Sequence, residues 1–490
     1  MTPTRLSKSR FMSGWQCLKR LYLEVYRPKL ATPLDKQTLA IMEQGQEVGR
    51  WARKAFPGGT LVDAGHDEME KALAQTEAAL RTSSPAIFEA TFSHQDVLAR
   101  VDILERPPDG QWRLIEVKSS TSLKEYHLYD VTLQSVLLEE LGMNVLPCLM
   151  HLNREYVYDG QQYDLAKLFV IREVADETAP LREVVRQTLE EERRALAASD
   201  PPDVASGKHC THPFSCPFYE TCNQELPIDH LLNLPALSGK KQALLTAQAI
   251  TSIGQIPKSF PLTERQRHAW ECVRSGRPWY GPGLKAALAG LCYPLYFMDF
   301  ETAGPALPRY AGMSPYDAIP FQWSVHVLRT PQAELEHFEF LADGGADPRP
   351  EFARSLCEVM GDQGSVIAYS AGFESSCLAA LARVLPEYQS QTENIRGRLW
   401  DLLTVVRDQV YHAEFRGSYS LKSVLPALVP GMTYHGLAIS EGSQASLAWE
   451  QMRCLPPGNS EREELRAHLL TYCGQDTLAM VRLLEVLQAG

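Results

Sequence analysis

The sequence predicts an α/β protein in which two mixed domains are joined by a small helical linker domain. Three stretches indicate this fold class: two strands around a turn at 99–120, an apolar strand at 294–304, and a stretch of helical period at 465–487. At 490 residues the chain is long enough for two or three domains that each bury a core. The boundaries that we expect are 1–225, 226–288 and 289–490.

The composition excludes several classes of protein. A net charge of −12 argues against a protein that coats nucleic acid indiscriminately, but not against a nuclease, whose metal site is built from carboxylates. Eleven unevenly spaced cysteines disfavour a disulfide framework. The chain has no apolar run long enough for a bilayer, and its basic N-terminus lacks the apolar core of a signal peptide. We therefore expect a cytoplasmic protein with no membrane partner.

Two acids and a lysine mark the N-terminal pair of strands. Asp102 lies on the first strand, and Glu116 and Lys118 share one face of the second, because side chains alternate across a strand. The sequence PPDG at 107–110 predicts the turn of a hairpin. Two acids can bind Mg²⁺, and a lysine can stabilise the attacking hydroxide or the charge of the phosphorane. A structural ion pair would use the same residue types.

This pattern resembles the PD-(D/E)xK nuclease superfamily, in its RecB and Cas4-like branch, over roughly the first 225 residues. Asp130 and Gln134 match the Gln-bearing helix of that branch. The resemblance implies a restriction-endonuclease-like fold that holds one or two Mg²⁺ or Mn²⁺ ions. Its metal ligands would be Asp102 and Glu116, with Lys118 and Gln134 as further catalytic residues.

The chain departs from that branch at two positions. The metal-binding His of the first helix falls near Gly49, and the Tyr four residues past the Gln is Leu138. The candidates for the missing contact are Glu89, Glu43 and Glu47. This loss favours an alternative in which the N-terminal domain binds nucleic-acid ends without cutting them.

Four cysteines suggest a metal group in the same domain. Cys210, Cys216 and Cys222 follow one another at intervals of C-x5-C-x5-C, and Cys17 lies far upstream. In the Cas4-like relatives one early and three late cysteines hold a [4Fe–4S] cluster, with C-x2-C-x5-C as the usual late spacing. The alternatives are Zn²⁺, with His209 and His212 as spare ligands, or buried free cysteines.

The stretches between these motifs are less specific. In the charged helix expected at 173–199, the run EEERR is typical of a solvated face. Short helices with Pro-bearing turns at 226–288 predict a compact helical connector.

The C-terminal domain carries scattered carboxylates. Asp299 and Glu301 lie two apart on an apolar strand and therefore share a face, where a divalent cation would relieve their repulsion. Glu374 begins a helix that follows a strand at 365–369. Tyr472 and Asp476 lie four apart on one face of a helix.

These motifs resemble the DEDD exonucleases of the DnaQ-like, RNase H-fold superfamily, in the tyrosine subclass. The resemblance implies two Mg²⁺ or Mn²⁺ ions and a Tyr472 that orients the attacking water. The implied metal ligands are Asp299, Glu301, Glu374 and Asp476. The family usually has Asp where this chain has Glu374. Asp401 is a rival fourth ligand, although we expect it to cap a helix at 402–411.

Along most of its length the chain resembles bacterial proteins of the DUF2779 type, through motifs such as LSKSRFMSGWQC and FMDFETAG. We therefore expect a 3′→5′ exonuclease of single-stranded DNA with a second, Cas4-like site, acting in DNA repair or in defence against mobile elements. The Cas4-like half favours DNA over RNA. Two alternatives stay open: only the DEDD site is active, or both sites are worn and the protein only binds nucleic acid. Four side chains are candidates to line the path of the nucleic-acid strand: Arg309, Tyr310, Tyr316 and Trp323. Alternatively, they are ordinary core or surface side chains.

Overall fold

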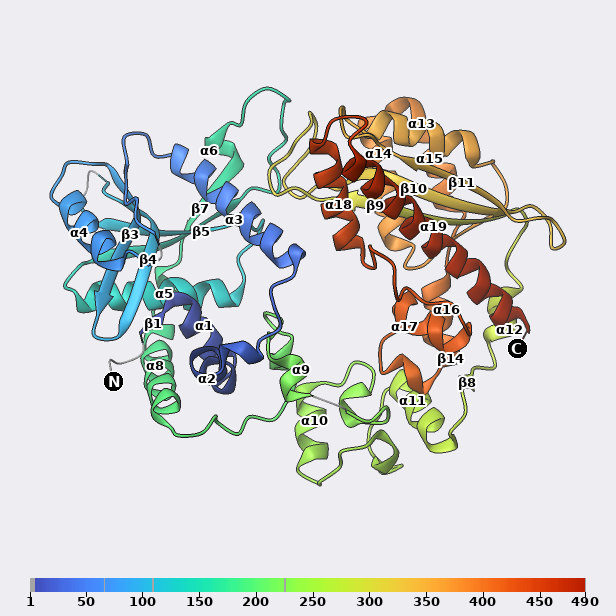
Figure 1. Cartoon of the computed structure of the whole chain (residues 1–490), viewed down its shortest axis with the longest axis horizontal. Helices are drawn as coiled ribbons and strands as arrows, with labels where there is room; N and C mark the ends of the chain where they lie inside the picture. The colour runs from blue at the N-terminus through green and yellow to red at the C-terminus, as the bar shows by residue number, and fades with distance from the viewer. Residues whose placement is uncertain (1–4, 66, 108–109, 224–225, 490) are drawn as a thin grey trace. The chain divides into compact units, whose positions relative to one another are not determined.

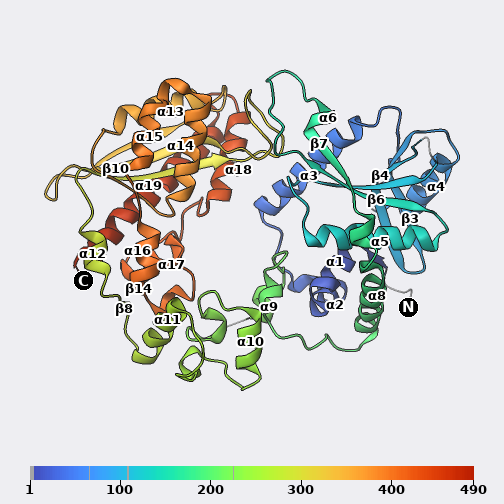
Figure 2. The same cartoon turned by 180° about the vertical axis from the view of Figure 1, so that it is seen from behind.

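The computed structural model describes residues 5–65, 67–107, 110–223 and 226–489. It is a mixed α/β structure with several sheets, which confirms the predicted α/β class (Figures 1 and 2). The chain divides into two compact units. Unit 1 comprises Met1–Gln224 and Pro305–Asp317, and unit 2 comprises Glu225–Gly304 and Ala318–Gly490.

Unit 1 is built on one twisted sheet of order β2-β3-β4-β5-β6-β7, with β1 paired to β4. β4 and β5 are antiparallel, as the predicted hairpin requires, while β5 and β6 are parallel. Pro108 and Asp109 of the predicted turn lie outside the described residues. The strands are β1 (Leu6–Ser7), β2 (Thr60–Leu61), β3 (Ala86–His94), β4 (Val97–Glu105), β5 (Trp112–Lys118), β6 (Val145–Leu152) and β7 (Phe169–Glu173).

Both faces of this sheet are buried. Leu104 and Leu114 belong to a core cluster with α1, α5 and α8, whereas Ile103 and Ile115 belong to a second cluster with α3 on the opposite face (Figure 1). Alternation along β4 and β5 therefore feeds two cores. The helices are α1 (Lys8–Gln16), α2 (Leu18–Tyr26), α3 (Lys36–Lys54), α4 (Met69–Leu80), α5 (Glu125–Glu140), α6 (Leu165–Leu168), α7 (Ala175–Thr178), α8 (Leu181–Ala197) and α9 (Tyr219–Cys222).

The segment 305–317 is part of unit 1 although the strands that flank it are in unit 2. Tyr158 and the segment exchange backbone hydrogen bonds: Tyr158 N donates to Met313 O at 2.9 Å, and Gly312 N donates to Tyr158 O at 2.8 Å. Ala306 and Leu307 are buried in the core cluster on the face of the sheet that α3 covers.

Unit 2 is built on a five-stranded sheet of order β11-β10-β9-β12-β13. β9 is central, antiparallel to β10 and parallel to β12. The strands are β8 (Trp279–Tyr280), β9 (Leu295–Ala303), β10 (Ile319–Leu328), β11 (Glu336–Leu341), β12 (Ser365–Ala368), β13 (Leu399–Asp401) and β14 (Val410–Tyr411), of which β8 and β14 form a separate pair.

Helices cover both faces of this sheet too. α19 crosses one face, where Leu295 and Phe297 share a core with Met480, and α13, α14 and α15 pack on the other face against Tyr296 and Met298 (Figures 1 and 2). The helices are α10 (Gly239–Thr246), α11 (Glu264–Ser275), α12 (Leu284–Leu288), α13 (Arg349–Val359), α14 (Gly372–Val384), α15 (Gln389–Gly397), α16 (Leu402–Gln409), α17 (Leu421–Leu428), α18 (Gly442–Cys454) and α19 (Ser460–Ala489).

The segment expected as a helical linker contributes to the core of unit 2. Leu231, Leu245 and Trp270 are buried in the same cluster as Val406 and Leu484. Across the described part of the chain, no helix combines the length and the apolar character that crossing a membrane requires.

The expectation that EEERR forms a solvated face is wrong for Glu192. Its side chain is fully buried in α8, where an added methyl group at Gly14 of α1 would come within 2.3 Å of its carboxylate oxygen. Burial raises the pKa of Glu192 to about 9, and the nearby Arg193 does not offset this effect. The α8 face that meets α1 therefore holds a protonated carboxyl group at neutral pH.

We predict that Glu192→Gln stabilises the protein at pH 8. An unfolded glutamate ionises near pH 4.5, so the wild type loses stability as the pH rises from there toward 9, whereas a glutamine does not. The expected gain in free energy of unfolding is about 1–3 kcal/mol at pH 8 and close to zero at pH 4. Urea unfolding at the two pH values measures it. The exposed neighbour Glu191→Gln is the control, and an equal effect of both variants would contradict the prediction.

Candidate active sites

A cluster of carboxylates lies between β9 and α19 in unit 2. Asp299 and Glu301 are on the face of β9 that α19 covers, and Tyr472 and Asp476 are on α19. Glu374, in the first turn of α14, is 3% exposed. Asp299, Tyr472 and Asp476 line the same pocket, and the charges of Asp476 and Glu374 act on both Asp299 and Glu301.

The pKa values record this proximity. Burial, followed by the charges of Asp476, Glu301 and Glu374, holds the pKa of Asp299 well above its usual range. Burial and then Asp476 raise the pKa of Glu301 to about 8. Burial also raises the pKa of Glu374 to about 7 and that of Asp476 to about 6. Acids that ionise with such difficulty make this cluster a candidate cation site.

Two residues that the sequence did not single out hold the α19 side of the cluster. The Tyr434 hydroxyl donates a hydrogen bond to Asp476 Oδ1. Lys422 Nζ lies 3.4 Å from the Tyr472 hydroxyl and 5.7 Å from the centre of the Tyr434 ring. Burial and then the neighbouring carboxylates raise the pKa of Tyr472 far above its usual value, so its phenol stays protonated.

A thiol also belongs to this cluster. Ligand atoms of Asp299, Glu301 and Cys473 lie mutually within 4.8 Å, and Cys473 Sγ is 3.8 Å from Asp299 Oδ2. The sequence did not single out Cys473, which is buried. Its only sequence signal is its place next to Tyr472.

Asp401 caps α16, as expected. Its Oδ1 accepts hydrogen bonds from Leu403 N at 3.0 Å and from Ser370 N at 2.9 Å. By contrast, within the described residues Glu374 Oε2 is buried without a hydrogen-bond partner. An orphaned buried carboxylate oxygen is a better candidate ligand than one already committed to a helix cap.

A pocket of about 470 Å³ opens beside the carboxylates. Cations and aromatic rings line it together with Asp299 and Asp476: Arg407, Lys422, Tyr369, Tyr419 and Tyr472. Trp323, one of the candidates for the strand path, is instead 2% exposed in the core. Arg309, Tyr310 and Tyr316 lie in the segment that belongs to unit 1.

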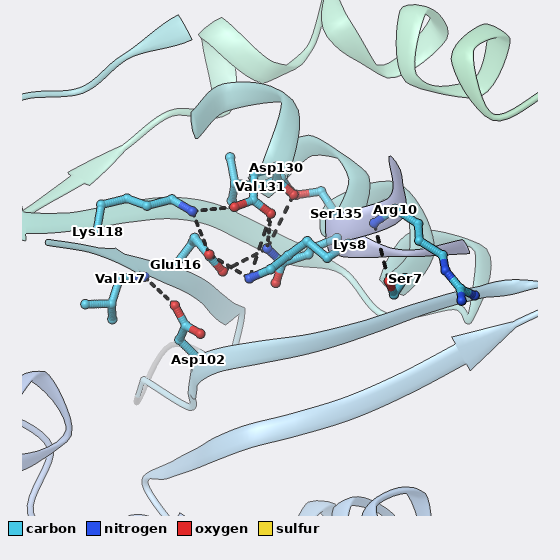
Figure 3. Close-up of polar contacts among 11 residues, drawn as sticks. Ser7, Lys8, Arg10, Asp102, Glu116, Val117, Lys118, Asp130, Val131 and Ser135 are labelled. Carbon is cyan, nitrogen blue, oxygen red and sulfur yellow. Dashed lines mark hydrogen bonds and ion pairs between the residues drawn. The ribbon is translucent and has the colours of Figure 1, made fainter. Parts of the chain in front are cut away.

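The second cluster, in unit 1, joins β4, β5 and α5 (Figure 3). Lys118 Nζ donates to Glu116 Oε1 at 2.8 Å and to Asp130. Gln134 Nε2 donates to Glu116 Oε2 at 2.9 Å. The predicted residues Glu116, Lys118 and Gln134 are therefore in direct contact. Asp102 Oδ2 accepts from Val117 N at 2.7 Å, and the charges of Glu116 and Lys118 act on its carboxyl group.

The charges of this cluster are largely balanced. Burial raises the pKa of Glu116, but the ammonium groups of Lys118 and Lys8 outweigh it and hold that pKa well below its usual range. Burial and then Glu116 raise the pKa of Asp102 to about 7. The sequence placed Lys8 only in a basic stretch of the N-terminus, without a role in this cluster.

Of the residues considered for the missing contact, Glu43 and Glu47 are exposed on α3. Glu89 pairs with Arg53 at 3.0 Å, although its charge still acts on Asp102. At the position of the missing His, a side chain on Gly49 would meet open space.

The four cysteines line one pocket in unit 1. Cys17 ends α1, Cys222 lies in α9, and the backbone N–H of Cys216 donates to Cys210 O at 2.9 Å. The amide of Gln16 fixes the two parts of the chain to each other. Its Nε2 donates to His209 O at 2.6 Å and to Phe214 O at 2.7 Å. Lys19 and Arg20 line the same pocket.

The fold and the carboxylate cluster describe a mixed α/β protein with an acidic, buried candidate metal centre. Residues 296–420 match the model of a family described as "Domain of unknown function (DUF2779)", which supports a DUF2779-type protein. The matched stretch runs from β9 to just before α17 and includes Asp299, Glu301 and Glu374. No curated protein matches the chain.

We predict that Mn²⁺ binds unit 2 more tightly at pH 8 than at pH 6. Protons compete with the metal for Glu301 and Glu374, whose pKa values of about 8 and 7 leave both largely protonated at pH 6. Affinity should rise about tenfold or more over this range. Thermal unfolding in a series of Mn²⁺ concentrations measures it. If Asp299→Asn keeps the same pH-dependent shift in Tm, the cluster is not the binding site.

Proposed function

We propose that the protein is a metal-dependent nuclease whose main active site is the carboxylate cluster of unit 2. The observation that carries this proposal is the convergence of Asp299, Glu301, Glu374 and Asp476 with Tyr472 beside a pocket lined by Lys422 and Arg407. Acids alone would suit many cation sites. Acids next to cations and aromatic rings suit a phosphodiester and a base.

The sheet supports the finer fold assignment. An RNase H-like domain of the DEDD type would place its first two acids on a central strand and its last on a helix across that strand. β9 and α19 supply such elements. For unit 1 the proposal is a restriction-endonuclease-like domain of the PD-(D/E)xK type.

In the proposed mechanism Asp299, Glu301, Glu374 and Asp476 hold Mg²⁺ or Mn²⁺, which would activate water and stabilise the departing 3′ oxygen. The protonated hydroxyl of Tyr472 orients the water, and Lys422 fixes that hydroxyl. Tyr434 fixes Asp476 by its hydrogen bond. The expected substrate is the 3′ end of single-stranded DNA. We expect the protein to act on it in the cytoplasm, in DNA repair or in defence against mobile elements.

Unit 1 is the second candidate site. Asp102 and Glu116 would be the metal ligands, and Lys118 would stabilise the charge of the phosphorane. The specific observation in its favour is that Lys118 and Gln134 both contact Glu116. The competing proposal, an end-binding module without cleavage, is favoured by the Gly at position 49, where the Cas4-like branch has its metal-binding His.

The four cysteines suit a [4Fe–4S] cluster better than zinc. Thiolates of a tetrahedral zinc site lie about 3.8 Å apart, since Zn–S bonds are about 2.3 Å long. Among the described residues, Cys17, Cys210, Cys216 and Cys222 line one pocket, yet no three of their sulfur atoms lie mutually within 4.8 Å. Lys19 and Arg20 offset the negative charge that four thiolates bring.

We predict that Asp299→Ala lowers Mn²⁺-dependent digestion of 3′-labelled single-stranded DNA by about 10²-fold or more. Lys118→Ala would remove only the activity of unit 1, and the double variant would remove both. The exposed Asp362→Ala is the matched control for unit 2. Full activity in the double variant would rule out the proposed nuclease. If the variants lost activity on labelled RNA to the same extent, RNA would replace DNA as the proposed substrate.

We also predict a brown protein that absorbs near ~400 nm when it is purified without oxygen. Cys17→Ser should lose the absorbance and the iron. Cys292→Ser, a change at an exposed cysteine, should keep both. A colourless protein with one equivalent of zinc would reverse the assignment.

A further inference from the structure

A second lysine enters the acid cluster of unit 1 from the end of α1 (Figure 3). Lys8 is the first residue of α1, and its Nζ lies 2.7 Å from Glu116 Oε1 and 3.8 Å from Asp130 Oδ1. The backbone holds it there, because β1 pairs with β4 immediately before α1. Ser7 caps the helix by accepting from Arg10 N at 3.4 Å.

The contacts of Glu116 leave little room for a divalent ion while Lys8 stays. Oε1 accepts from Lys8 and from Lys118 at 2.8 Å, and Oε2 accepts from Gln134 at 2.9 Å. A carboxylate oxygen has two lone pairs, so Oε1 is saturated. A metal ion bound there has to displace a donor. Of the two donors to Oε1, Lys8 has the more exposed side chain, at 26% against 18% for Lys118, so Lys8 is the donor that leaves more easily.

The charges lead to the same residue. When Asp102, Glu116 and Asp130 are all ionised, these three carboxylates and the ammonium groups of Lys8 and Lys118 together carry one net negative charge. Without Lys8 the cluster carries two net negative charges, which match one divalent cation. With both lysines in place, the same cation would create a net positive charge in a buried site.

We propose that Lys8 is a built-in competitor of the divalent metal ion in unit 1, whose ammonium group fills the cation position until it is displaced. This inference rests on the proposed metal site of unit 1 and adds a gate to it. Metal entry then requires the Lys8 side chain to swing toward solvent, while α1 stays paired to the sheet through β1.

The test is a Mn²⁺ titration of the full chain, followed by the electron paramagnetic resonance signal of free Mn²⁺. Asp299→Asn is present throughout, so that binding at unit 2 is suppressed. Adding Lys8→Met, which keeps the length and removes the charge, should tighten binding at least about tenfold. Arg10→Met on the same helix should leave it unchanged, because the Arg10 guanidinium contacts Arg5 O instead. Adding Glu116→Gln should abolish the gain.

Unchanged or weaker Mn²⁺ binding in Lys8→Met overturns the proposal. Lys8→Gln serves if the methionine variant melts early. Cleavage separates this proposal from the function of unit 1. Tighter Mn²⁺ binding without any Lys118-dependent cleavage keeps the competitor and rejects the nuclease. Lys118-dependent cleavage with unchanged Mn²⁺ binding rejects the competitor alone.

Discussion

The repulsion among buried carboxylates is the constraint on which the centre of unit 2 depends. Asp299 and Glu301 lie on the middle strand of the sheet, where Glu301 is buried and Asp299 is half-buried. α19 brings Asp476 to the same place. Two features reduce this repulsion. Raised pKa values keep carboxyl groups protonated, and the hydrogen bond from Tyr434 and the charge of Lys422 offset negative charge. Such an arrangement is costly without a cation, and this cost explains why so many polar side chains converge there.

Unit 1 solves the same problem in a different way. Two ammonium groups lie among its acids and keep Glu116 ionised, although burial raises the pKa values of Asp102 and Asp130. The two clusters therefore differ in what must leave when a cation arrives. At the proposed metal sites, protons would leave in unit 2 and the Lys8 side chain would leave in unit 1. The pH and the salt concentration should act on the two units separately for this reason.

The sequence predicted the parts of the sites that depend on local geometry. Alternation along a strand put Glu116 with Lys118 and Asp299 with Glu301, and helical spacing put Tyr472 with Asp476. The meeting of distant segments came from resemblance to known families and not from periodicity. Tyr434 lies in an irregular stretch with no pattern around it. The burial of Glu192 was not predicted, because a run of charged residues does not indicate which face of a helix is covered by another helix.

The path of the chain between β9 and β10 has a consequence for the evolution of the protein. Because Ala306 and Leu307 complete the core of unit 1, a fragment ending at the first crossover lacks part of its own interior. The polypeptide passes from one unit to the other three times. Recombination at a single breakpoint would leave a cavity in the core of unit 1 and an apolar segment without its packing partners in unit 2. We therefore expect the two units to be inherited together in one gene.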